Sequence, residues 1–138
     1  MLLAEQRVCR VATLTSRGAP HVSPLWFVWD GTSLWLYSIV SSQRWADLLR
    51  DARAAVVVDA GVHYDELRGV ELRGRVEPVG AVPRTGEEDH PELATPERLY
   101  AAKYGGRSDE SMYHDGRHAW LRLTPDKMVS WDHHKIGS

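Results

Sequence analysis

Residues 22–39 read VSPLWFVWDGTSLWLYSI and contain two strand-like runs, 22–29 and 34–39, separated by DGTS at 30–33. Asp-Gly between two apolar runs is a strong local signal for a β-hairpin. Both runs are apolar on both faces, and strands of this kind are covered twice in a folded protein. We therefore expect one cover to be the interior of a small barrel and the second to be a helix, a ligand or another subunit.

Pro24 interrupts the first of these runs. Proline has no backbone N–H and donates no ladder hydrogen bond, so it occurs in sheets at edges, bulges or gaps. We expect an edge, a bulge or a gap at Pro24. A gap there leaves backbone groups free to bind a ligand.

The rest of the chain has the spacing of further strands and two helices. Alternating or apolar runs predict strands at 8–15, 54–59, 70–79, 117–124 and 127–131, the last two forming a pair around Pro125-Asp126. Helices are predicted at 42–52, with a stripe of Trp45, Leu48, Leu49 and Ala52, and at 95–104. The second helix is expected to start with Thr95 as its cap and proline at its first position. This order predicts one domain, 1–138, built as an antiparallel barrel with two helices at its ends.

Composition excludes several classes of protein. The chain of 138 residues has 17 basic and 19 acidic side chains and a formal net charge of −2. Nucleic-acid-binding proteins normally show a basic face, so we expect no nucleic-acid partner. The sequence contains no apolar run of about 18 residues, the length that a membrane helix needs, so we expect no membrane partner. The single cysteine excludes an internal disulfide and is typical of a reducing cytoplasm, where we expect the protein to be.

The segment 37–44, YSIVSSQR, combines hydroxyl groups, an amide and a guanidinium where a strand meets the first turn of a helix. Free N–H groups and the positive end of the helix dipole favour an anion there. The Arg44 guanidinium matches the geometry of a phosphate. The alternative is purely structural, with Ser42 capping the helix and Arg44 pairing with Asp47.

Neither a metal site nor a reactive thiol is expected. His133 and His134 are adjacent, so on a strand they point to opposite faces, and a turn signal separates His114 from His118. Cys9 is expected to be a buried, inert thiol.

Five ordered segments resemble a known family. They are ATLT at 12–15, GAPHVSPLWFV at 18–28, SSQR at 41–44, LLRDAR at 48–53 followed by valines, and the closing segment 122–132. Together they resemble the split β-barrel flavin and deazaflavin oxidoreductases, the pyridoxamine-phosphate-oxidase-like proteins. The similarity is greatest to the small actinobacterial branch that uses coenzyme F-420, an 8-hydroxy-5-deazaflavin. The resemblance implies an FMN-binding type of split barrel, mainly β, with six or seven antiparallel strands and two or three short helices.

The resemblance also implies a homodimer with two cofactor sites between the subunits. One stretch would lie along the ring system, largely through its backbone: Val22, Ser23, Pro24, Leu25 and Trp26. A second set would hold the phosphate: Tyr37, Ser38, Ser42, Gln43 and Arg44. Trp131 and Asp132 would approach from the other subunit. Arg50, together with Arg53 and Lys103, is a candidate for the glutamyl tail of F-420.

Departures from the family pattern narrow the activity. True pyridoxamine-phosphate oxidases carry a basic residue where Ser23 stands and another near Val28, and both are missing here. We expect instead an oxidoreductase in which reduced F-420 passes a hydride to a small unsaturated or aromatic acceptor. The alternatives are an FMN-dependent enzyme using the same cleft and a non-catalytic protein that binds a cofactor or haem. Nothing in the sequence selects a general acid.

Overall fold

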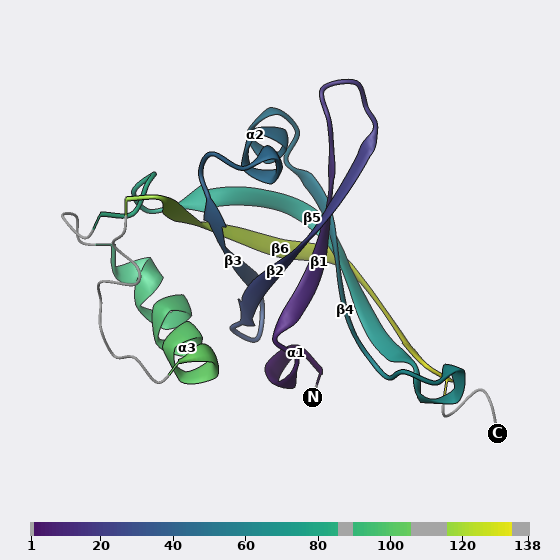
Figure 1. Ribbon diagram of the computed structural model, residues 1–138. Helices are drawn as coiled ribbons and strands as arrows, with labels where there is room; N and C mark the ends of the chain where they lie inside the picture. Colours follow the sequence, from purple (N-terminus) through teal and green to yellow (C-terminus); the bar gives the residue numbers. More distant parts are fainter. Residues whose placement is uncertain (1, 86–89, 106–115, 134–138) are drawn as a thin grey trace.

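The computed structural model describes residues 2–85, 90–105 and 116–133. Six strands form a closed antiparallel barrel in the order β1-β2-β3-β6-β5-β4 (Figure 1). The strands are β1 Val8–Leu14, β2 Pro20–Trp29, β3 Leu34–Ile39, β4 Arg53–Ala60, β5 Arg68–Val79 and β6 His118–Asp132. The helices are α1 Leu2–Glu5, α2 Gln43–Arg50 and α3 Ala94–Tyr104, and two 3₁₀ turns are η1 Tyr64–Glu66 and η2 Pro91–Leu93. The predicted fold class, mainly β with a barrel and two or three helices, is confirmed.

The predicted hairpin between β2 and β3 is closed by Asp30. Its carboxylate accepts hydrogen bonds from the backbone N–H groups of Thr32, at 2.8 Å, and Ser33, at 2.7 Å, and from the indole N–H of Trp35, at 2.8 Å. Gly31 has a φ of 104°, a conformation that costs glycine little and other residues much. Local sequence therefore specifies this turn.

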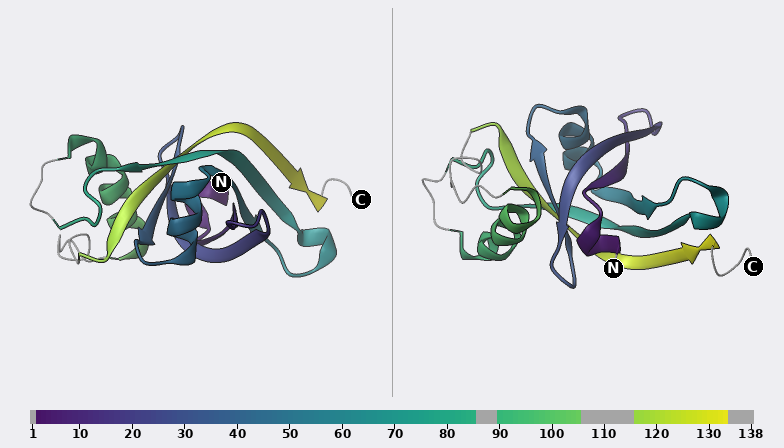
Figure 2. Two further views of the ribbon diagram at one scale, coloured as in Figure 1. Left: turned by 90° about the horizontal axis from the view of Figure 1, so that it is seen from above. Right: turned by 60° about the horizontal axis from the view of Figure 1, so that its bottom comes forward.

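The described residues form two hydrophobic clusters, one on each side of the barrel wall. The first fills the barrel interior and includes Phe27, Leu36 and Leu72. The second lies between the outside of the wall and α3, and includes Trp35 and Trp120. Figure 2 shows α3 against this outer side in both views. The double cover expected for β2 and β3 is thus partly supplied by the barrel interior and α3.

The barrel is split beside β2. From Pro20 to Trp26 β2 pairs with β1, and it pairs with β3 only through Phe27, Val28 and Trp29. The remaining residues of β3, from Tyr37 to Ile39, pair only with β6. Pro24 therefore lies opposite Arg10 on one side and has no strand partner on the other among the described residues. The expected gap at Pro24 is present.

The expected hairpin at Pro125-Asp126 is wrong. Residues 118–132 form one long strand, β6, that pairs with β5 from end to end. Gly74 lies opposite Pro125 and Arg73 opposite Lys127, so Asp126 is an extra residue at a β-bulge. A bulge tolerates the missing N–H of proline, which explains why the strand continues where the sequence indicates a turn.

Both helix predictions need correction in detail. In α2, Trp45 and Leu48 are buried as expected, but Leu49 is 61% exposed. The face of α2 that meets the barrel instead buries two polar side chains, as described below. In α3, Thr95 is not the cap: the turn η2 leads directly into the helix, which begins at Ala94. In β5 the predicted alternation holds, with Leu72 and Val76 inward and Arg73 and Arg75 exposed.

Strands β4, β5 and β6 continue beyond the barrel as an arm that ends at η1, far from α3 (Figures 1 and 2). Near the end of the arm the ring of Trp131 covers Gly69, where an added Cβ would overlap the indole. A larger residue at this position would force the indole to shift. Among the described helices, none has the length and apolar character needed to cross a bilayer.

Candidate functional site

Arg44 joins two strands at the mouth of the split. It lies on the first turn of α2, and its Nε donates to the Ser38 hydroxyl of β3 at 3.2 Å. Its Nη1 donates to the Ser23 hydroxyl of β2 at 2.8 Å. Three residues that the sequence assigned to the cofactor, from segments far apart in the chain, therefore share one contact cluster, which we call the Arg44 cluster.

The Arg44 guanidinium is buried without a counter-ion. The residue is 8% exposed, and within the described ranges no carboxylate lies within ion-pair distance of it. Burial lowers its pKa, the direction expected when a charge leaves water without compensation. Buried charges in proteins are normally paired. The Arg44 cluster therefore has the donor chemistry and the charge to receive an anion such as a phosphate.

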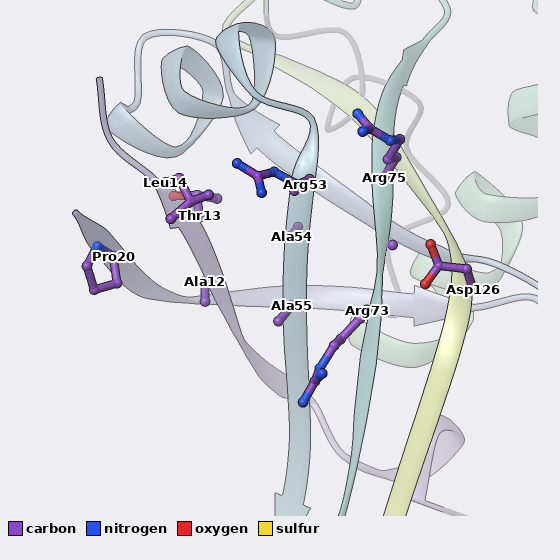
Figure 3. A pocket seen from close by; sticks show the side chains of 11 residues that line it. Ala12, Thr13, Leu14, Pro20, Arg53, Ala54, Ala55, Arg73, Arg75 and Asp126 are labelled. Carbon is purple, nitrogen blue, oxygen red and sulfur yellow. The ribbon is translucent and has the colours of Figure 1, made fainter. Parts of the chain in front are cut away.

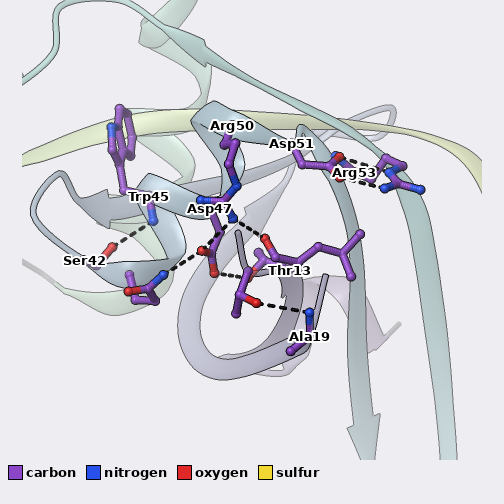
Figure 4. A network of polar contacts seen from close by, with 11 residues as sticks. Thr13, Ala19, Ser42, Trp45, Asp47, Arg50, Asp51 and Arg53 are labelled. Carbon is purple, nitrogen blue, oxygen red and sulfur yellow. Dashed lines mark hydrogen bonds and ion pairs between the residues drawn. The ribbon is translucent and has the colours of Figure 1, made fainter. Parts of the chain in front are cut away.

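Asp47 organises a second polar network on the same helix (Figure 4). Its fully buried carboxylate accepts hydrogen bonds from Thr13 Oγ1 at 2.9 Å, Gln43 Nε2 at 2.7 Å and Arg50 Nη2 at 3.2 Å. Burial acts to raise the pKa of Asp47, but these hydrogen bonds outweigh it and the net pKa is lowered. The network fastens α2 to β1 and thereby holds Arg44 over the barrel.

This network changes the picture of the predicted phosphate turn. Gln43 and Arg50 direct their side-chain nitrogens to Asp47, and Arg50 also donates to the Leu14 carbonyl at 2.7 Å. Ser42 caps the helix by accepting the Trp45 N–H at 3.1 Å, as both interpretations of the sequence allow. The proposed Arg44–Asp47 pair is absent, because residues 43 and 50, at helical spacings of four and three, reach Asp47 instead.

The predicted ring-binding stretch of β2 is divided between two faces. Ser23 and the partly buried Leu25 face the barrel side, where Leu25 packs against the interior cluster. Val22, Pro24 and Trp26 are exposed on the other face, Val22 by 65% and Trp26 by 43%. The side chains of the two sets point to opposite faces of β2. The backbone groups along the unpaired edge of β2 lie between these faces and are next to both sets.

Tyr37 lies apart from the Arg44 cluster, because successive residues of a strand point to opposite faces. Its ring stacks on His118 with centroids 4.7 Å apart and meets Trp120 at 4.8 Å. Only 7% of Tyr37 is exposed. In the described structure Tyr37 supports the wall beneath α3, while Ser38 reaches Arg44.

Trp131 and Asp132 lie at the end of the arm, opposite Gly69 and Arg68 of β5. In the ribbon, α2 lies above the middle of the molecule and the end of the arm lies well away from it (Figure 1). Within one chain these two residues therefore do not join the Arg44 cluster.

Trp26 has aromatic partners that the sequence did not indicate. Its ring lies parallel to Tyr104 of α3, with centroids 4.3 Å apart and an interplanar angle of 5°. Tyr100 approaches at 6.1 Å with a tilt of 50°. No local signal reveals these contacts, because they join segments separated by more than 70 residues. Lys103 also belongs to α3: its ammonium donates to the Leu3 and Phe27 carbonyls and lies away from Arg50.

A separate hollow of about 460 Å³ lies on the outer face of β1, β4 and β5 (Figure 3). Arg53, Arg73 and Arg75 surround a floor of small residues that includes Ala12 and Ala55. Two of the guanidinium groups already have carboxylate partners, Arg53 with Asp51 and Arg73 with Glu71. Asp51, Glu71 and Asp126 together balance the charges of the three arginines around this hollow. Arg44, by contrast, has no carboxylate within ion-pair distance in the described ranges.

The thiol and metal expectations concern other parts of the structure. Cys9 is fully buried, and burial raises the pKa of its thiol to about 12, so it remains protonated and unreactive at neutral pH. Among the described residues, no group of three histidine, cysteine or acidic side chains is arranged to hold a metal ion. His114 and His134 lie outside the described residues.

Comparisons with known proteins bear on this site. The family model for pyridoxamine 5'-phosphate oxidase matches residues 1–132. No curated protein sequence matches the chain. A conserved hypothetical protein from Mycobacterium tuberculosis is 30% identical over 99% of this chain and 84% of its own, with a TM-score of 0.78. An F-420 reductase is 22% identical over 93% of this chain and 93% of its own, with a TM-score of 0.69. A haem storage protein from Vibrio cholerae is 13% identical over 93% of this chain and 88% of its own, with a TM-score of 0.75. The last two likenesses concern the fold alone.

Proposed function

The chain belongs to the pyridoxamine 5'-phosphate oxidase family, and we propose that it is an oxidoreductase that binds coenzyme F-420 and transfers a hydride to a small molecule. FMN in the same site is the alternative cofactor. Ser23 supports a reaction other than pyridoxamine-phosphate oxidation, because a hydroxyl bound to Arg44 stands where the resemblance expects a basic side chain. The name of the F-420 reductase neighbour agrees with the proposal.

The observation that carries the proposal is the uncompensated charge of Arg44. Both F-420 and FMN carry a phosphate, and a guanidinium held by two hydroxyls offers fork-shaped donors to it. The Ser38 and Ser23 hydroxyls orient the guanidinium, and α2 adds the positive end of its dipole beside it. The residues present therefore fit a phosphorylated cofactor.

The unpaired edge of β2 would bind the rest of the cofactor. Between Pro20 and Trp26 the backbone on this side has no strand partner among the described residues, so its polar groups are available to a planar heterocycle. Trp26 lies three positions after Ser23 in the strand, which corresponds to a distance of roughly 10 Å along the chain. The phosphate site and the ring site are therefore spaced along one strand. The bound coenzyme supplies the hydride chemistry, and the protein supplies orientation and a water-poor wall.

We also propose that the site is completed in a homodimer. Val22, Trp26, Met128 and Val129 are each more than 40% exposed, which leaves apolar surface to be covered. The arm extends beyond the barrel, so Trp131 and Asp132 near its end would lie against a second copy (Figure 1). Light scattering at micromolar concentration is expected to give the mass of two chains, and a monomeric mass would contradict this arrangement.

Competitive titration tests the cofactor assignment. The protein is expected to bind F-420 more tightly than FMN, and Arg44→Ala is expected to weaken binding of either by about 1.5–3 kcal/mol, the range for hydrogen bonds to charged groups. Arg10→Ala is the matched control, because Arg10 is an exposed arginine of the neighbouring strand that is paired with Asp59. Equal affinity of the Arg44 variant and the wild type would remove the phosphate assignment, and tighter FMN binding would reverse the order of cofactors.

A second candidate function is non-catalytic binding of a cofactor or haem. The structural likeness to a haem storage protein favours it. A Soret band after addition of haem to the purified protein would support this function. Binding of F-420 without reduction of any acceptor in a broad panel would support a protein that stores the coenzyme.

A further inference from the structure

Trp26 is unusual among the large aromatic side chains because it is ordered by stacking and still 43% exposed. Tyr104 lies parallel to the indole at 4.3 Å and covers one of its faces. The exposed fraction therefore belongs mainly to the opposite face and the ring edge. A flat apolar face turned outward beside the unpaired edge of β2 is a surface on which a second planar ring can stack.

Tyr104 is held in place by the strand that carries Trp26. Its hydroxyl accepts the Phe27 N–H at 3.0 Å and lies 2.7 Å from both the Phe27 carbonyl and the Arg7 carbonyl, to one of which its single proton is donated at a time. Burial raises the pKa of the Tyr104 phenol, so the hydroxyl keeps its proton and these bonds persist over the neutral range. The phenol thus connects the end of α3 to the residue next to Trp26.

This arrangement exceeds what packing requires. A tyrosine that only filled space beneath α3 would resemble Tyr100, which is 8% exposed, belongs to the buried cluster and meets Trp26 only at a tilt. Tyr104 instead fixes the angle of a partly exposed indole, because its hydroxyl is held by the backbone of Phe27 and Arg7. Such fixation reduces the entropy that a loose wall would lose when a ligand binds.

We propose that Tyr104 is a positioning residue that holds Trp26 as a rigid wall for the planar ring of the redox cofactor. The inference rests on the proposed function and deepens it, because it divides the site into two parts. Arg44 binds the phosphate, and the Tyr104–Trp26 pair binds the ring. Tyr104 itself acts through Trp26.

Two probes separate these parts: inorganic phosphate, and a deazaflavin that carries the ribityl chain but no phosphate. Tyr104→Leu removes the stack and is expected to weaken the phosphate-free deazaflavin roughly three- to tenfold, the range of an aromatic pair. Its affinity for inorganic phosphate is expected to be unchanged. Tyr104→Phe keeps the stack but loses the hydroxyl bonds, so its deazaflavin affinity is expected to lie between wild type and Tyr104→Leu. Arg44→Ala is expected to show the reverse pattern.

Leu99→Ala is the matched control, because it removes from the same helix a partly buried aliphatic side chain that packs against the second hydrophobic cluster. It is expected to lower the free energy of unfolding while leaving deazaflavin affinity close to wild type. Equal deazaflavin affinity in wild type and Tyr104→Leu overturns the inference and leaves the proposed function standing. Parallel losses for both probes in Tyr104→Leu also overturn it, since they show general damage. A wild type that binds no deazaflavin overturns the proposed function, and the inference falls with it.

Discussion

Two buried arginines are surrounded differently. Arg84 is 7% exposed and forms a double ion pair with Glu97, with Nε–Oε2 at 2.9 Å and Nη2–Oε1 at 3.1 Å. Trp120 donates its indole N–H to the same carboxylate at 2.9 Å. Arg44 is equally buried, at 8% exposed, but its partners are two serine hydroxyls. Among the residues that the structure describes, one guanidinium has a carboxylate partner and the other has none.

The difference indicates what each residue is for. Arg84 and Glu97 join the segment before α3 to α3 itself, and their charges cancel, so this pair belongs to the architecture. A cation that the fold buries without an anion costs stability. Its presence at the mouth of the split is explained if an anion from outside the chain completes it.

The largest expected effect comes from removing the counter-ion of Arg84. Glu97→Gln removes the charge that accepts two hydrogen bonds from Arg84 and one from Trp120, and the free energy of unfolding in denaturant titration is expected to fall by about 3–5 kcal/mol. Arg10→Ala, which breaks an exposed pair with Asp59, is the control and is expected to change it by less than about 1 kcal/mol. A Glu97→Gln loss as small as that of the control would show that the Arg84 pair is not a buried structural pair.

A smaller effect is expected at Arg44. Phosphate at ten times its dissociation constant is expected to stabilise the wild type by about 1.4 kcal/mol, because it binds the folded state only. In Arg44→Met this stabilisation is expected to disappear, while stability without phosphate is expected to equal or exceed that of the wild type. Both quantities are measured by denaturant unfolding in two sulfate-free buffers of equal ionic strength, one containing phosphate and the other chloride. If the variant is markedly less stable without phosphate, Arg44 is structural in the manner of Arg84.

The smallest effect concerns Lys103, a partly buried cation that, like Arg44, has no carboxylate within ion-pair distance in the described ranges. Burial lowers the pKa of its ammonium to about 8 from 10.5. Between these values the unfolded chain binds more protons than the folded one, so this group makes the protein more stable as pH rises through that window. The gain is expected to be about 1 kcal/mol, because Lys103 is only partly buried. The contribution of Lys103 is measured by comparing the free energies of unfolding of wild type and Lys103→Met at pH 8 and pH 10.5. If both proteins change equally between these pH values, Lys103 does not have a buried ammonium.

Several features follow from local sequence alone. The Asp-Gly turn, the alternation of β5 and the gap at Pro24 are all consequences of backbone chemistry within a few residues. Local signals also failed in identifiable ways. Pro125 indicates a turn, yet the long ladder between β5 and β6 absorbs it as a bulge, because many hydrogen bonds on both sides outweigh one missing donor.

For the site, the resemblance placed Ser23 in the ring-binding stretch and Ser38 and Arg44 in the phosphate set, and the structure brings all three into contact. It could not predict that Gln43 and Arg50 donate hydrogen bonds to the Asp47 carboxylate. Helical spacing allows Asp47 several partners, and burial selects among them. It also gave no reason to connect Tyr104 with Trp26, because nothing in either segment encodes where α3 docks.

The amino-acid sequence by itself determined most of the strands, the Asp-Gly turn and the presence of one guanidinium at the start of α2, because these depend on side chains and backbone within a short window. Only the tertiary structure decided which buried arginine is paired and which is not. Charge compensation depends on distances between segments far apart in the chain, and those distances exist only once the barrel has closed and α2 and α3 have docked against it.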